Sequence, residues 1–70
     1  MSAMDIFDRI AKRRIELGLS RQALAKRLGC SRRHVWRIET GALPRFPAAD
    51  LLRIAHALRT TVGALYGEAP

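Results

Sequence analysis

The segment from Arg32 to Thr40 contains the side chains whose types and spacing best suit a chemical task. Placing successive residues about 100° apart, as in an α-helix, brings Val35 and Ile38 together on a side that must face a core. The opposite side contains Arg32, Arg33, Trp36, Arg37 and Thr40. An α-helix fits the major groove of DNA, where the planar guanidinium of arginine matches O6 and N7 of guanine. We therefore expect the three arginines and the tryptophan of this side to contact base edges; a solvated basic helix is the alternative.

The charge of the chain is concentrated around the same segment. The formal net charge is +7, and nine of the 13 Lys and Arg residues lie within residues 12–37, where Glu16 is the one acidic residue. Such a basic middle indicates one basic face on a folded unit, with a polyanion as its partner. Nucleic acid and an anionic membrane surface both fit that description.

Length and composition exclude several classes of protein. The chain has 70 residues, of which 49% are hydrophobic. This length and composition predict one small domain, residues 1–70, with a hydrophobic core. Its apolar runs are too short for a transmembrane helix, and no signal peptide is visible. A single cysteine, Cys30, forms neither an internal disulfide nor a cysteine-based zinc site. We find no catalytic constellation, and expect a cytoplasmic non-enzyme with no cofactor, metal or small-molecule ligand.

Capping residues and glycines divide the chain into five short helices. Ser20, Ser31 and Thr61 suit helix N-caps, and Gly29 and Gly41 suit helix ends. The helices are expected at residues 5–17, 21–28, 32–39, 48–58 and 62–66, with prolines excluding a helix across residues 41–47. Since no segment alternates as a strand does, the fold class is all-α. The two helices joined by a Gly-Cys-Ser turn suggest a helix-turn-helix motif.

The stretch from Gly18 to Gly41 resembles the helix-turn-helix of the phage lambda Cro/cI repressor and xenobiotic-response-element family. The segments Leu51–Leu58 and Thr61–Val62 also match, so the resemblance covers about residues 6 to 66. It implies a lambda-repressor-like domain in which residues 21–28 cross the DNA backbone and residues 32–39 lie in the major groove. It further implies an ion pair between Arg14 and Glu39 that joins the first helix to the recognition helix.

The resemblance implies that Arg21 lies at the DNA backbone and the edge of the groove, and the chain departs from the family at three positions. The other backbone contacts are expected from their places beside the outward face of the recognition helix. The expected backbone contacts are Arg21, Gln22, Ser31, His34, Thr40 and Arg45, with plain exposure as the alternative for His34. Arg21 stands where the family often has glutamine, and Arg59 where it commonly has glycine, which predicts a positive φ at Arg59. Trp36 replaces a small or polar residue, and could stack on sugar, contact a thymine methyl or pack between dimer halves. Cys30 is interpreted as a small buried hydrophobe rather than a redox sensor.

The function that follows is a sequence-specific transcriptional regulator of double-stranded DNA, acting as a repressor by occupying a promoter. Phage repressors, restriction–modification controllers and antitoxins share this size and fold, so an antitoxin-type autoregulator remains an alternative. A basic amphipathic module that binds membranes or an acidic protein is an alternative of another class. Short helices interrupted by glycine and proline argue against it.

One recognition helix contacts too few base pairs to be selective, so we expect a homodimer on a palindromic operator. The expected dimer interface contains Phe46, Val62, Leu65 and Tyr66, which are apolar residues late in the chain. In the competing interpretation, Val62 and Leu65 close the core of one chain, Phe46 covers that core, and Tyr66 is simply exposed.

Overall fold

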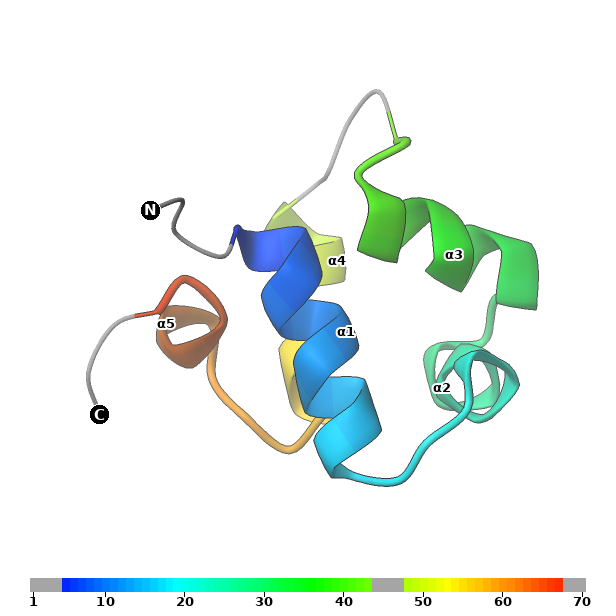
Figure 1. The fold of residues 1–70 in the computed structure, drawn as a ribbon, viewed down its shortest axis with the longest axis horizontal. Helices are drawn as coiled ribbons and strands as arrows, with labels where there is room; N and C mark the ends of the chain where they lie inside the picture. The colour runs from blue at the N-terminus through cyan, green and yellow to red at the C-terminus, as the bar shows by residue number, and fades with distance from the viewer. Residues whose placement is uncertain (1–4, 44–47, 68–70) are drawn as a thin grey trace.

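The computed structural model of the chain describes residues 5–43 and 48–67 and contains five helices (Figure 1). They are α1 (Ile6–Glu16), α2 (Arg21–Leu28), α3 (Arg32–Thr40), α4 (Ala48–Ala57) and α5 (Val62–Leu65). The described residues include no strand, which confirms the all-α class. Every helix end lies within one residue of the position expected from the sequence. No helix in the described part of the chain is long and apolar enough to cross a bilayer.

The helices begin where short polar side chains can accept hydrogen bonds from free backbone N–H groups. The hydroxyl oxygens of Ser20, Ser31 and Thr61 accept from the amides three residues later, at 3.0, 3.1 and 3.0 Å. Gly41 ends α3 with φ 72°, and a Cβ there would lie 3.2 Å from the ring of Phe7. Glycine at this position therefore allows the end of α3 to pack against the start of α1.

The core lies where α1 meets the other helices. Ile10, Leu24, Val35, Ile54 and Leu58 are almost fully buried, and they come from α1, α2, α3, α4 and the residue after α4. Figure 1 shows α1 across the middle of the molecule, with α5 on one side and α2 and α3 on the other. Because α3 packs on α1 and α2 through one face, its opposite face is left open to solvent.

Arginine side chains tie the helices together by donating to carbonyl groups at helix ends. Arg13 on α1 donates from Nε to the Leu58 carbonyl at 3.0 Å and from Nη2 to the Arg59 carbonyl at 3.1 Å. Arg27 on α2 donates to Ala57 at 3.1 Å, and Arg53 on α4 donates to Leu28 at 2.6 Å. These contacts satisfy carbonyls that have no partner within their own helix, where positive charge also suits the helix dipole.

The chain leaves α4 through a backbone conformation that is rare for a side chain with Cβ. Arg59 has φ 53°, which confirms the positive φ expected from its position. The amide of Thr60 donates to the Ala55 carbonyl at 2.9 Å, so this turn is closed by a hydrogen bond typical of a helix C-terminus.

Candidate nucleic-acid interface

The outward face of α3 holds the side chains that the sequence suggested for base contacts. Val35 and Ile38 on the inner face are 0% and 3% exposed, whereas Trp36 is 47% exposed. The base-contacting candidates are Arg32, Arg33, Trp36 and Arg37, and all four are exposed. Their exposure follows from the helical period, because a helix that buries Val35 and Ile38 must turn the intervening residues toward solvent.

The guanidinium groups of Arg32, Arg33 and Arg37 make no hydrogen bond or ion pair with another group in residues 5–43 and 48–67. Arg32 and Arg33 line an open hollow with Trp36, Ser31 and Arg21, between the start of α2 and the start of α3. The guanidinium groups of Arg21, Arg32 and Arg33 thus lie beside the exposed indole of Trp36. Such a surface suits a polyanion that also presents flat groups with hydrogen-bond acceptors.

The residues expected to contact the DNA backbone differ in their exposure and in the hydrogen-bond donors they have available. Gln22 is exposed, and Ser31 lies beside the hollow, where its oxygen caps α3 and its hydroxyl proton stays available. His34 is half-buried in a small cleft that it shares with Cys30 and Arg53. Thr40 donates its hydroxyl proton to the Trp36 carbonyl of its own helix at 2.8 Å, so in this arrangement it has no donor for a phosphate. Arg45 lies outside the described residues.

Behind this face, Glu39 binds two arginines rather than one. Its carboxylate accepts from Arg14 Nε at 2.6 Å and Nη2 at 3.1 Å, and Arg14 Nη1 also donates to the Leu19 carbonyl at 2.8 Å. Arg21 Nε donates to Oε1 of the same carboxylate at 3.0 Å. The structure thus brings Arg14 and Glu39 together, with side chains 11% and 2% exposed. The Arg21 contact with Glu39 could not be predicted from the sequence, since an arginine at a helix start suits a phosphate equally well.

Cys30 lies in the turn between α2 and α3, partly buried and beside Arg53 and Asp50 of α4. Burial raises the pKa of its thiol, and Asp50 raises it too, while the Arg53 charge opposes them. A raised pKa favours the unreactive thiol, in keeping with a packing role. Within the described ranges no three His, Cys, Asp or Glu side chains gather as metal ligands would.

The residues expected at a dimer interface fall into three environments. Leu65 is 2% exposed and belongs to the core, so it has almost no surface left for a second chain to bury. Its assignment to the interface is wrong, because packing against α1 and α4 already removes it from water. Val62 is half-buried against the same core, whereas Tyr66 is 60% exposed. Phe46 lies outside the described residues.

The sequence and the fold are similar to those of known helix-turn-helix proteins. The family model described as a helix-turn-helix domain matches residues 8–65. The master regulator of biofilm formation SinR, solved in complex with DNA, superposes with a TM-score of 0.76 at 27% identity, covering 86% of this chain and 95% of that one. A hypothetical transcription factor from Neisseria superposes with a TM-score of 0.80 at 21% identity, covering 87% and 69% of the two chains.

The same fold also occurs inside a larger protein. Hydroxypropylphosphonic acid epoxidase from S. wedmorenis superposes with a TM-score of 0.81 at 33% identity over 87% of this chain. The match covers 32% of the epoxidase, so this chain spans about a third of its length. Among curated proteins, none matches the sequence significantly.

Proposed function

The chain belongs to the helix-turn-helix domain family, and we propose that it is a transcriptional regulator that binds double-stranded DNA with α3 in the major groove. This membership confirms the resemblance seen in the sequence. The observation that best supports the proposal is the outward face of α3, where three arginines and a tryptophan are exposed beside a buried, aliphatic inner face. SinR, which is similar over most of both chains, was solved with DNA bound.

Arginine chemistry explains how this face would distinguish sequences. A guanidinium can donate two parallel hydrogen bonds to O6 and N7 of guanine, and Arg32, Arg33 and Arg37 have no competing partner among the described residues. Exposed groups at the start of α2, including Gln22, would donate to phosphates and set the position of α3 in the groove. Phosphate contacts would thus supply affinity, and the arginines of α3 would supply sequence preference.

We propose that two copies bind a palindromic operator and repress by occupying a promoter. Half-sites on one face of DNA lie about 34–36 Å apart. The longest dimension of the described chain is 31 Å between Cα extremes, so copies placed at that spacing would be near enough to touch. With Leu65 in the core, the exposed Tyr66 and the half-buried Val62 are the residues left for this contact.

Sedimentation with a full palindrome and with a single half-site tests the pairing. We expect two chains on the palindrome and a higher affinity than on the half-site, and we expect Tyr66→Ala to remove that gain. One chain per palindrome, with no gain over the half-site, would contradict the dimer.

The likeness to an epoxidase does not lead us to propose an enzyme. It covers about a third of that protein, and the exposed side chains of α3 suit a nucleic acid rather than a small substrate. The function is tested by selecting bound duplexes from a random pool and measuring binding to anionic vesicles in parallel. We expect an enriched motif with at least one G·C pair in each half-site. Vesicle binding without an enriched duplex would overturn the proposal.

A further inference from the structure

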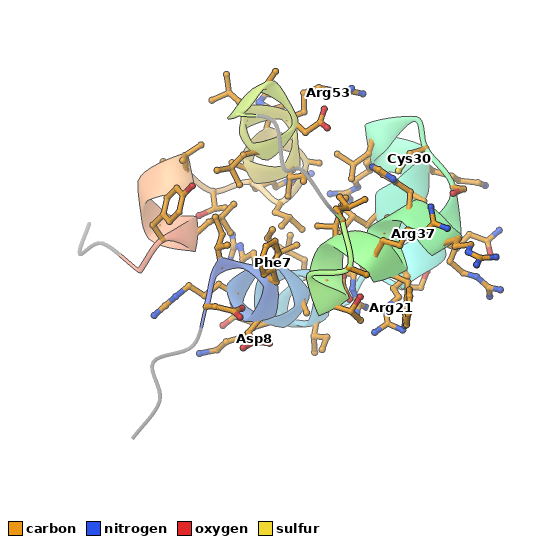
Figure 2. All side chains as sticks on the ribbon, turned by 90° about the horizontal axis from the view of Figure 1, so that it is seen from above. Phe7, Asp8, Arg21, Cys30, Arg37 and Arg53 are labelled. Atoms are coloured by element: carbon orange, nitrogen blue, oxygen red, sulfur yellow. The ribbon has the colours of Figure 1, made fainter. Side chains whose placement is uncertain are left out.

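Arg21 differs from the other exposed arginines near α3, because its Nε donates a hydrogen bond to the buried carboxylate of Glu39. Glu39 Oε1 accepts from Arg14 Nη2 at 3.1 Å and from Arg21 Nε at 3.0 Å. The Glu39 side chain is 2% exposed, whereas that of Arg21 is 42% exposed. Arg21 therefore extends from a buried anchor to the surface. Figure 2 shows Arg21 alongside α3.

Only one edge of the Arg21 guanidinium is used in this contact. An arginine has five N–H donors, and Glu39 takes the one on Nε, which leaves both terminal nitrogens unpaired in the described part of the chain. The side chain lines the hollow with Arg32, Arg33 and Trp36. It also lines a second hollow with Ser20 and Gln22 at the start of α2. The Arg21 side chain thus lies where α2 and α3 meet at the candidate interface.

The anchor itself is fixed by a second arginine. Arg14 uses Nε and Nη2 on Glu39 and Nη1 on the Leu19 carbonyl, so the carboxylate is held between α1 and the α1–α2 loop. Two guanidinium groups around one carboxylate keep a formal charge of +1, which still attracts a phosphate or a base acceptor. An arginine already held in its binding orientation loses less side-chain freedom when it binds than a free one does.

We propose that Glu39 is a positioning residue for DNA binding, which holds the Nε edge of Arg21 so that its terminal edge faces the DNA. This inference rests on the proposed DNA-binding function. In it, Arg14 and Glu39 affect DNA affinity through Arg21, although neither touches the DNA. Lysine cannot replace Arg21, because one ammonium group lacks two separated donor edges for Glu39 and DNA together.

A double-mutant cycle on DNA affinity tests the coupling. The four proteins are the parent, Glu39→Gln, Arg21→Ala and the double variant, each measured on the selected duplex at a temperature where it is folded. We expect Glu39→Gln to weaken binding about tenfold in the parent and hardly at all in the Arg21→Ala background. Arg33→Ala is the matched control, because a general tilt of α3 would couple Glu39 to Arg33 as well, whereas positioning of Arg21 leaves those two effects additive.

A conservative pair of variants gives an independent measurement if Glu39→Gln does not fold. Arg21→Lys keeps the charge at an exposed site, and we expect it to bind DNA about tenfold more weakly than the parent. Arg27→Lys makes the same change on the same helix, where the arginine donates to Ala57 instead, and should bind as the parent does. Equal affinities for Arg21→Lys and the parent, or additive effects in the cycle, would overturn the positioning role alone. No binding to any duplex would overturn the proposed function as well.

Discussion

The arginines on the outward face of α3 and those between the helices behind it are chemically identical but have different surroundings. Arg32, Arg33 and Arg37 make no hydrogen bond or ion pair with other described residues. The arginines behind this face bind backbone carbonyls or a buried carboxylate, and they are Arg13, Arg14, Arg27 and Arg53. We call the first set the outward arginines and the second set the inner arginines.

The difference shows that a high arginine content does not by itself locate a binding surface. Each inner arginine already uses at least one donor on a carbonyl or carboxylate of the protein, and that donor is unavailable to DNA without loss of the contact. An outward arginine still has its full set of donors in solvent. Arg21 belongs to neither set, because one of its edges binds Glu39 and the other is exposed.

The largest expected effect is the response of DNA affinity to salt, which reports on all the Lys and Arg side chains that contact phosphates, outside the inner set. A dimer that neutralises ~6–10 phosphates should lose ~10³–10⁵ in affinity between about 50 and 200 mM salt, because binding releases condensed counterions. Fluorescence anisotropy with a labelled duplex measures this. Thermal unfolding of the free protein over the same range is the control, since the buried pair of Arg14 and Glu39 and the part-buried bonds of Arg13 Nε and Arg53 should be screened less. A flat salt response would show that the basic face does not bind DNA through its phosphates.

The next effect concerns the buried carboxylate on which the inner set depends. Glu39→Gln leaves the charge of Arg14 buried without a matching anion, and should lower the free energy of unfolding by ~3–5 kcal/mol. Urea denaturation followed by circular dichroism measures it. Glu16→Gln is the control, because the Glu16 side chain is 53% exposed and lies 4.0 Å from Arg13, so ~0–1 kcal/mol is expected there. Unchanged stability in Glu39→Gln would mean that the ion pair is solvated.

An alanine variant from the outward set should lose DNA affinity but not stability, and one from the inner set should lose stability but not base preference. Arg33→Ala should cost ~1–3 kcal/mol on the selected duplex and much less on random DNA, with little change in melting. Arg13→Ala should lower stability by ~1–2 kcal/mol, because the carbonyls of Leu58 and Arg59 lose a charged donor. It should leave base preference unaltered. Equal losses for Arg33→Ala on both kinds of DNA would make Arg33 a backbone contact.

The smallest effect is expected at Arg59, which lies in the turn after α4 and belongs to neither set. Its φ of 53° costs a residue with Cβ about 1–2 kcal/mol. Glycine avoids that cost but loses about 0.5–1 kcal/mol more in backbone entropy on folding, so Arg59→Gly should raise the free energy of unfolding by ~0.5–1 kcal/mol. Differential scanning calorimetry measures the shift, and Arg59→Ala is the control, since it removes the side chain but keeps the Cβ. Equal melting temperatures for the glycine and alanine variants would show that the backbone there is not strained.

The helices and the outward face of α3 could be predicted from the sequence because both depend on neighbours a few residues apart. Ser31 caps α3 through an amide three residues on, and Gly41 ends the helix by its own backbone freedom. The 3.6-residue period then turns the three arginines outward once Val35 and Ile38 are buried. The pairing of Arg14 with Glu39 was available only through the family resemblance, since nothing local joins residues 25 apart.

The partners of the other arginines were decided by the tertiary structure alone. Arg13 reaches a carbonyl 45 residues away, and Arg21 reaches Glu39, which is 18 residues further along the chain. Leu65 likewise became a core residue because α5 packs against α1 and α4. A sequence specifies that an arginine has five donors and a long, flexible side chain. Whether those donors meet a carbonyl, a carboxylate or solvent depends on which helices pack beside it, and that is a property of the folded chain.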